Sequence, residues 1–296
     1  MPWNMVLKDG YVGKLAHNLV RMNQTNPATY LPGRSTVANT NSRRMLLPGV
    51  YASVREVNTS ANAAYHSLQV VLNKRLSRGL TVLVAYTMGK MLDYYSAMNL
   101  GQVPQDPNNQ RADRARSDED RRHTFNASFF YEIPAWRQQK GVLGKTLGGW
   151  TLSGMVRQAS GGPINIISGV DNSLTGVGFD RPDLAGNPVR SHSGREDMIQ
   201  RFFNTAAFVA NQPGLYGSAG RNLVSGPAQA TTSLSLVKSF PISERLGRIQ
   251  FRSEFFNAWN QVNFGQPEAR VNNRSFGRIL SAGSPRIVQL ALRYQF

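Results

Sequence analysis

The last eleven residues, Arg286 to Phe296, constrain the fold more than any other stretch of the chain. Every second residue from Val288 to the end is apolar or aromatic, and the residues between them are mostly polar. Because a β-strand has a side-chain period of two, the segment has one apolar face and one polar face. Its length is about the 9–11 residues with which a tilted strand crosses a bilayer. The pattern favours a membrane-spanning strand, with an edge strand of a soluble sandwich as the alternative.

The apolar set of this strand resembles the C-terminal assembly signal of bacterial outer-membrane β-barrel proteins. The chain ends on an aromatic residue with no polar tail after it. The resemblance implies the barrel assembly machinery as a partner. The residues of the expected signal are Val288, Leu290, Leu292, Tyr294 and Phe296.

Composition excludes several classes of site and leaves the partner open. The chain has no cysteine, which excludes disulfides, thiolate zinc sites and cysteine nucleophiles. It has no apolar run of 18 residues, so no transmembrane helix is expected. The formal net charge is +17, with 34 basic against 17 acidic residues. Such an excess is typical of nucleic-acid binding. The arginines are scattered, however, and suit anionic lipopolysaccharide or a cation-lined lumen equally well.

Alternating segments predict a series of antiparallel strands. Residues 4–23 predict an extended piece, a polar turn near Lys14–Asn18 and a short return, and Val50–Val57 a short strand within a loop. Ile164–Ser168 is a candidate extension of the strand before it, and adjacent Phe255 and Phe256 indicate a bulge. The clearer predicted strands span residues 68–76, 80–88, 123–133, 150–156, 228–239, 248–259 and 286–296.

The connections alternate in length, which a soluble sandwich does not require. In an up-and-down membrane barrel, short turns lie on the periplasmic side and long loops outside. Aromatic residues near the strand ends fit girdles at the two membrane interfaces. The long connections are 93–122, 169–227 and 260–285, and the shorter ones are 77–79, 134–148 and 240–247.

Several segments resemble the C-terminal part of TonB-dependent outer-membrane receptors, specifically the Oar-like group that bears a carboxypeptidase-regulatory-like domain. The matching stretches are YVGKLAHNL (11–19), AYHSLQVVLNKRLSRGLTVLVAYTMGKMLD (64–93), DPNNQRADRARSDEDRRHTFNASFFYEIP (106–134), LGGWTLSG (147–154), SLTGVGFDRPDLAG (173–186), LVKSFPISERLGRIQFRSEFFNAWNQVNFGQP (236–267) and FGRILSAGSPRIVQLALRYQF (276–296). The resemblance implies a barrel of about 22 strands, a plug in its lumen and an N-terminal box that engages TonB.

No plug, regulatory domain, TonB box or export signal is found in this sequence. With loops this long, the chain holds about seven to nine strands. We therefore expect an all-β, antiparallel up-and-down transmembrane barrel segment with long extracellular loops, in which residues 1–296 form a partial receptor barrel domain. Its partners would be outer-membrane lipid, lipopolysaccharide and the missing N-terminal barrel and plug segments, with TonB engaged only through those segments.

Catalytic, cofactor and metal motifs are weak, and we expect none of these sites. Gly144-Lys145-Thr146 lacks the first glycine of a P-loop and is interpreted as a turn. Ser191-His192-Ser193 has no orienting acid, and the four histidines have no ligand spacing.

The densest polar cluster lies between Asp106 and Arg122. It could bind an anionic sugar or a cation at the pore mouth. We favour a mutually paired ionic network at the base of an extracellular loop, because both signs are mixed almost one for one. Its candidate members are Asp106, Arg111, Asp113, Arg114, Asp118, Asp120, Arg121 and Arg122.

The sequence therefore predicts the wall of an outer-membrane receptor that takes up a substrate. Alternatives are a small self-closed outer-membrane barrel and a soluble basic β-protein that binds nucleic acid. We expect no nucleic-acid partner, because the aromatic residues lie on the face opposite most polar groups. A glycan-processing enzyme would need two converging carboxylates, whereas the acids lie mainly in one loop. The residues expected to face lipid are Phe125, Phe129, Tyr131, Leu290, Leu292 and Tyr294, and those expected to face the lumen are Asn126, Ser128, Gln289 and Arg293.

Overall fold

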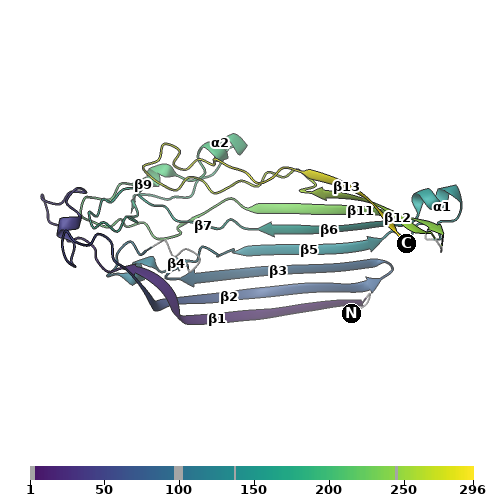
Figure 1. The fold of residues 1–296 in the computed structure, drawn as a ribbon, viewed down its shortest axis with the longest axis horizontal. Coiled ribbons are helices and arrows are strands. Elements are labelled where there is room, and N and C mark those ends of the chain that lie inside the picture. The colour runs from purple at the N-terminus through teal and green to yellow at the C-terminus, as the bar shows by residue number, and fades with distance from the viewer. Residues whose placement is uncertain (1–3, 97–102, 137, 244–245) are drawn as a thin grey trace.

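The computed structural model describes residues 4–96, 103–136, 138–243 and 246–296, and its main feature is one long antiparallel sheet (Figure 1). Eight long strands lie in the order β1-β2-β3-β5-β6-β11-β12-β13, and the short β4 (Ala115–Arg116) pairs with β3. The prediction of an all-β antiparallel architecture is confirmed. The long strands are β1 (Met5–Gln24), β2 (Arg55–Ser77), β3 (Leu80–Asp93), β5 (His123–Glu132), β6 (Trp150–Ala159), β11 (Gln229–Ser243), β12 (Gly247–Phe256) and β13 (Ile287–Gln295).

The remaining elements are short and lie in the connections. No helix among the described residues is long and apolar enough to cross a membrane. These elements are α1 (Gly141–Leu147), α2 (Arg195–Gln200), the 3-10 turns η2 (Asn41–Arg43), η3 (Gln110–Asp113) and η4 (Thr205–Ala207), and the two-residue strands β7 (Pro163–Ile164), β8 (Asp183–Leu184), β9 (Phe208–Val209) and β10 (Val224–Ser225).

The expected turn near Lys14–Asn18 is wrong, because β1 runs unbroken for 20 residues. It pairs with β2 from Met5, opposite Lys74, to its far end. The polar stretch forms a bulge instead: the register shifts on both sides of Leu19, and Asn18 has a left-handed φ of 58°. A bulge bends a strand without reversing it, and Figure 1 shows β1 bending toward its C-terminal end.

Three further expectations are corrected. The strand expected at Val50–Val57 begins only at Arg55, as the start of the 23-residue β2. Ile164–Ser168 does not extend β6, since β7 pairs with β10 in a separate small sheet. Phe255 and Phe256 form no bulge, because both keep regular pairing with β13, and the strand ends at Phe256, just before Asn257, where φ is 49°.

Cross-strand pairing places most of the apolar residues of the long strands on one face of the sheet. Residues directly opposite each other in neighbouring strands share a face. Tyr86 of β3 therefore shares a face with Phe125 of β5, and Leu292 of β13 shares it with Phe251 of β12. We call this the apolar face, and the opposite one, with Asn126, Ser128, Gln289 and Arg293, the polar face.

Lys238 is an exception on the apolar face, and the connection between β5 and β6 explains it. Its side chain is 1% exposed. Its Nζ donates to the carbonyl of Gly148 and lies 4.7 Å from the ring centroid of Phe240 and 5.8 Å from that of Trp150. The ammonium is thus satisfied by a carbonyl and two aromatic rings.

The connections are sorted by length between the two ends of the sheet. The start of β1, the end of β13, helix α1 and the short connections lie at one end, whereas the long connections gather at the other (Figure 1). This arrangement matches the alternation of connection lengths in the sequence. The structure adds one further long connection, residues 25–54, to the predicted set. We call the long connections, residues 25–54, 94–122, 160–228 and 257–286, the loop layer.

The sheet is open among the described residues. β1 pairs only with β2, and β13 pairs only with β12. Each of these two strands therefore presents one edge of unpaired backbone groups.

Candidate functional site

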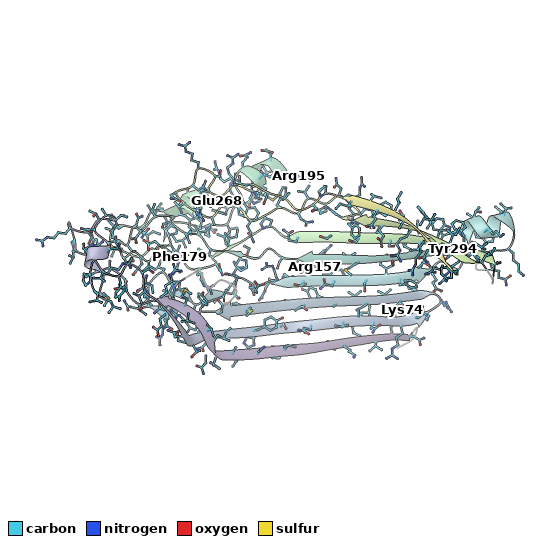
Figure 2. The ribbon with its side chains drawn as sticks, in the orientation of Figure 1. Lys74, Arg157, Phe179, Arg195, Glu268 and Tyr294 are labelled. Carbon is cyan, nitrogen blue, oxygen red and sulfur yellow. The ribbon has the colours of Figure 1, made fainter. Side chains whose placement is uncertain are left out.

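The loop layer contains the main apolar cluster of the molecule rather than a set of independent loops. Side chains crowd this end, where Phe179 and Glu268 lie, while Lys74 and Tyr294 mark the opposite end (Figure 2). Rings of Phe203, Phe208 and Phe276 meet edge to face at 5.2–6.1 Å between centroids. Such contacts stabilise aromatic clusters beyond their buried area. The buried members of the cluster are Ile164, Ile166, Phe203, Ala207, Phe208, Ala219 and Val224.

Arg181 joins two segments of the loop layer that are far apart in sequence. It is 4% exposed, and its guanidinium pairs with the buried carboxylate of Asp113. Its Nε also donates to the carbonyl of Ala219 at 2.7 Å, and its terminal nitrogen to that of Ala112 at 3.2 Å. The backbone N–H of Arg181 donates to the Oε1 of Gln105 at 2.7 Å. The side chain and the backbone N–H of Arg181 thus together hold residues 105–113 against residues 181–219.

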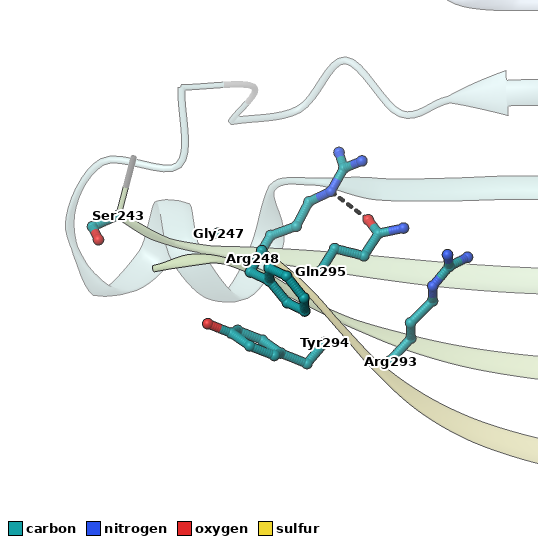
Figure 3. A pocket seen from close by; sticks show the side chains of 7 residues that line it. Ser243, Gly247, Arg248, Arg293, Tyr294 and Gln295 are labelled. Atoms are coloured by element: carbon teal, nitrogen blue, oxygen red, sulfur yellow. Dashed lines mark hydrogen bonds between the residues drawn. The ribbon is translucent and has the colours of Figure 1, made fainter. Parts of the chain in front are cut away.

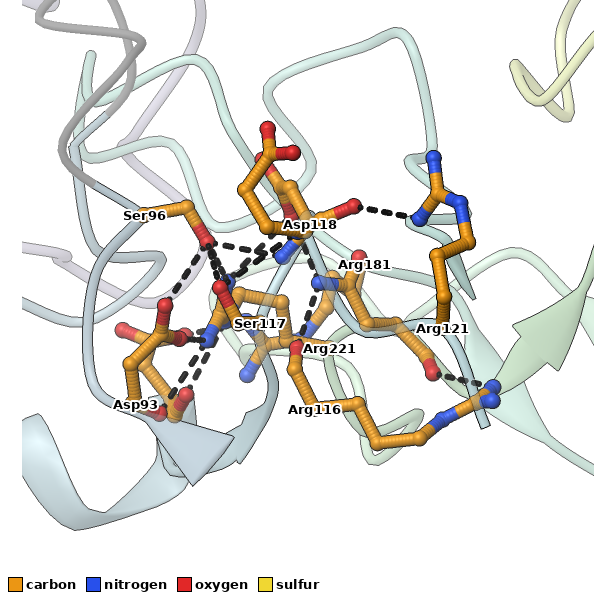
Figure 4. A network of polar contacts seen from close by, with 11 residues as sticks. Asp93, Ser96, Arg116, Ser117, Asp118, Arg121, Arg181 and Arg221 are labelled. Carbon is orange, nitrogen blue, oxygen red and sulfur yellow. Dashed lines mark hydrogen bonds and ion pairs between the residues drawn. The ribbon is translucent and has the colours of Figure 1, made fainter. Parts of the chain in front are cut away.

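Arg221 makes a second connection between the same two segments (Figure 4). Its guanidinium pairs with Asp93 at the end of β3 and lies 3.5 Å from the Oδ1 of Asp118. It also donates to the Oγ of Ser96 at 3.2 Å. Asn222 follows and donates to the same Asp118 oxygen at 2.6 Å. These contacts attach the loop to the sheet itself.

The structure places the eight predicted network residues in one region, but their charged partners differ from the expectation. Asp113 and Asp118 pair with arginines of the 160–228 connection, and the ion pairs found among the described residues include none within 106–122. Sequence reasoning did not single out Arg181 or Arg221. The sequence indicates their ion pairs only weakly, because their partners lie more than sixty residues away in the chain.

Most of the other predicted members contact groups of their own connection or of β3. Asp106 accepts from the N–H of Asn108, Asp120 accepts from the N–H of Met91, and Arg121 donates to the carbonyls of residues 118 and 120. The guanidinium of Arg114 lies 5.3 Å from the Tyr94 ring centroid. The side chains of Arg111 and Arg122 are exposed.

The first long connection, residues 25–54, also belongs to this layer. Arg43 donates to the carbonyl of Leu174 at 3.0 Å, and the N–H of Ala28 donates to that of Thr175 at 2.8 Å. Nearby, the carboxylate of Asp180 accepts from the N–H and hydroxyl of Ser173 at 2.6 and 2.8 Å. Burial raises the pKa of Asp180, against the lowering effect of those hydrogen bonds.

A groove of about 600 Å³ lies on the surface of the loop layer. Its lining comes from both the 160–228 and the 257–286 connections, including Ile167, Phe179, Arg270 and Asn272. One cation and several amide groups could hydrogen-bond a polar ligand there. Among the described residues, no group of three or more His, Asp or Glu could hold a metal ion.

The proposed assembly signal lies at the opposite end, on the apolar face of β13. Leu290 and Leu292 are 64% and 74% exposed, and Phe296 is fully exposed. Tyr294 donates its hydroxyl to the carbonyl of Leu246 at 2.7 Å. Val288, the remaining member of the signal, pairs with Phe255.

A pocket at this end is lined by residues from the end of β13 and the start of β12, which are in close contact (Figure 3). The Nε of Arg248 donates to the Oε1 of Gln295 at 2.6 Å. Gly247 has a φ of 71°, and a Cβ there would lie 1.9 Å from the carbonyl oxygen of Gln295. Position 247 therefore requires glycine both for its left-handed backbone and for its space.

Comparisons with known proteins agree with the architecture. No curated protein matches the chain. The crystal structure of the outer membrane transporter YddB from Escherichia coli is similar, with a TM-score of 0.54 and 10% sequence identity over 99% of this chain. The chain spans 30% of the length of that transporter. The structure of Pseudomonas aeruginosa FpvA bound to a heterologous pyoverdine also matches, at a TM-score of 0.38 and 9% identity, over 98% of this chain and 27% of FpvA.

A family model described as the outer membrane beta barrel domain matches residues 1–289, which is nearly the whole chain. The family match agrees with the antiparallel sheet, its apolar face and the sorting of its connections. The chain therefore belongs to the outer membrane β-barrel domain family and is a protein of the outer membrane.

Proposed function

We propose that this chain forms part of the wall of a TonB-dependent transporter barrel of the Oar-like group, which takes up a substrate across the outer membrane. The observation that carries the proposal is the open sheet. Its eight strands have one continuous apolar face, and both β1 and β13 leave an edge unpaired. In lipid, each unsatisfied backbone group costs several kcal/mol, so these edges need partner strands.

The orientation follows from the two faces. The apolar face, with Phe125, Phe129 and Tyr131, contacts lipid, and the polar face lines the lumen. On the polar face, the Nη1 of Arg252 lies 3.6 Å from the Oε1 of Glu254, and such an ion pair suits a water-filled lumen. The loop layer lies outside the cell and would contact the substrate, and the short connections face the periplasm.

The role that we propose for this domain is structural rather than catalytic. Its strands form the wall, and the loop layer holds the outer mouth in a fixed shape through Arg181 and Arg221. A plug and a TonB-engaging segment, supplied by further parts of the transporter, would couple uptake to energy. The barrel assembly machinery would insert the whole through the terminal strand.

Expression with an upstream barrel segment tests the proposal. Residues 1–296, exported behind a signal peptide, are expected to aggregate alone and to insert when strands that complete the barrel are supplied. Heat-modifiable migration on a gel reports a closed barrel. Heat-modifiable migration of residues 1–296 alone, without uptake, would support a small self-closed barrel instead. Substrate uptake by residues 1–296 alone would refute the proposal.

A further inference from the structure

Three basic side chains lie side by side at the outer margin of the apolar face. His66 of β2 is directly opposite Lys90 of β3, and His123 of β5 is opposite Met88, two residues from Lys90 on the same face. All three side chains are exposed. Neighbouring strands lie about 4.8 Å apart, so the three groups span about 10 Å. We call them the rim cluster.

The rim cluster marks the end of the apolar band. Along β3 the apolar face carries Leu80, Val82, Val84, Tyr86 and Met88, and then Lys90. The band from residue 80 to residue 90 rises roughly 33 Å along the strand, or about 25 Å across a bilayer at the usual tilt. That height is the thickness of a barrel's apolar band, so Lys90 lies at the level of the outer headgroups.

Both histidines are held in the same way by a tyrosine. The hydroxyl of Tyr86 hydrogen-bonds the Nδ1 of His123 at 2.8 Å, and that of Tyr11 hydrogen-bonds the Nδ1 of His66. In each pair the rings are stacked, with centroids 6.2 and 6.0 Å apart. When the hydroxyl donates to Nδ1, the ring proton resides on Nε2, which becomes a donor available to an anion.

A groove of about 470 Å³ begins at the rim cluster. It runs from β3 across β5 and β6 to β11 and is lined by Tyr86, His123, Phe125, Gln158 and Ala230. These residues belong to the apolar face. A lipid whose headgroup contacts His123 would find space for its upper acyl chain in this groove.

We propose that the rim cluster is a docking site for the phosphate of an outer-leaflet glycolipid of the lipid A type. The proposal rests on the orientation given under Proposed function. Lys90 supplies a charged donor, and the two imidazoles supply neutral or charged donors on either side. Asp9, the acid on the apolar face of β1, lies two rows of residues away from Lys90 and across β2 from it, so it does not neutralise the cluster.

Native mass spectrometry tests the site in the completed barrel, in which residues 1–296 are assembled with the upstream barrel segment, in detergent and with added lipid A. We expect lipid A to be retained and enzymatically dephosphorylated lipid A to be lost. Lys90→Gln should weaken binding roughly fivefold, the effect of one basic residue at an anionic surface. The triple variant His66→Gln, Lys90→Gln, His123→Gln should lose the phosphate preference, and Lys90→Arg should keep it.

Lys14→Gln is the matched control. Lys14 lies at the same height, opposite Tyr65, but on the polar face. The site would be overturned if Lys14→Gln lost lipid A as much as Lys90→Gln does. It would also be overturned if the unmodified protein retained dephosphorylated lipid A as well as lipid A, or bound inorganic phosphate tightly in place of lipid. Flotation with phosphatidylcholine vesicles separates the two proposals. A completed barrel that floats without phosphate preference refutes only the rim cluster, and a completed barrel that never floats refutes both.

Discussion

Replacing Arg181 by alanine should open the loop layer without unfolding the sheet. Arg181 and Asp113 are both nearly fully buried, and the variant leaves the carboxylate without its cation. It also removes donors from the carbonyls of Ala219 and Ala112. Breaking a buried ion pair from one side costs about 3–5 kcal/mol. Because the pair joins two loops, that cost falls on the local opening of residues 105–113 and 181–219.

Hydrogen exchange in the assembled barrel measures this opening. The backbone N–H of residue 181 donates to the Oε1 of Gln105 at 2.7 Å, across the two loops, so its exchange reports whether they stay together. A loss of about 4 kcal/mol speeds exchange through local opening by roughly three orders of magnitude. Amides in the centre of β5 should not change. The double variant Asp113→Ala, Arg181→Met should recover much of the loss, because neither charge is then buried alone.

Arg190→Ala is the matched control in the same connection. The guanidinium of Arg190 donates to the Oδ1 of Asp197 at 2.7 Å, but both side chains are about a quarter exposed. Exposed pairs contribute little, so exchange should stay close to that of the unmodified chain. Acceleration below fivefold in Arg181→Ala, or equal acceleration in both variants, would refute the assignment of Arg181 as the connection between the loops.

Three further predictions concern the apolar face, the terminal strand and the loop layer. Leu290→Arg should cost roughly 2–4 kcal/mol of barrel stability in urea titrations in lipid, whereas Gln289→Arg on the polar face should be tolerated; the reverse order would exchange the two faces. Deletion of Phe296 should leave protein that is made but stalled in the periplasm, as measured by membrane fractionation, and normal insertion would count against the signal. Burial raises the pKa of Tyr216 to about 12, so the loop layer should lose stability as the pH rises from about 10 to 12; Tyr216→Phe should remove the matching step in ultraviolet absorbance, and an unchanged titration would contradict it.

The sequence predicted best those strands whose side chains form the apolar band. Strands β3, β5, β6 and β13 were expected within a few residues of their bounds, because lipid or a core enforces a period of two. The stretch of β2 from Asn58 to Ser67 was missed, as was the continuity of β1. Both stretches lie toward the loop end, where apolar and polar residues do not alternate. Their strand structure follows from pairing between β1 and β2 and, from Ala63 on, between β2 and β3.

The loop layer was less predictable for a different reason. The acids of residues 106–122 were recognised as a cluster, yet Arg181 and Arg221 come from a connection that looked irregular. The pairing of these arginines with Asp113, Asp118 and Asp93 depends on how two loops fold over the sheet, and it cannot be predicted from local sequence. The same holds for Phe203 and Phe276, which meet across more than seventy residues of chain.

The central claim is that β1 and β13 pair with strands other than each other, and disulfide trapping tests it most directly. The chain has no cysteine, so paired substitutions report without background. One cysteine would be placed in turn at Lys8, Gly10 and Val12 of β1, and the other at Ala291 of β13. We predict no disulfide between β1 and β13, and disulfides from both strands to an upstream barrel segment when it is supplied. A disulfide between β1 and β13 in a heat-modifiable monomer would show a self-closed barrel and contradict the claim.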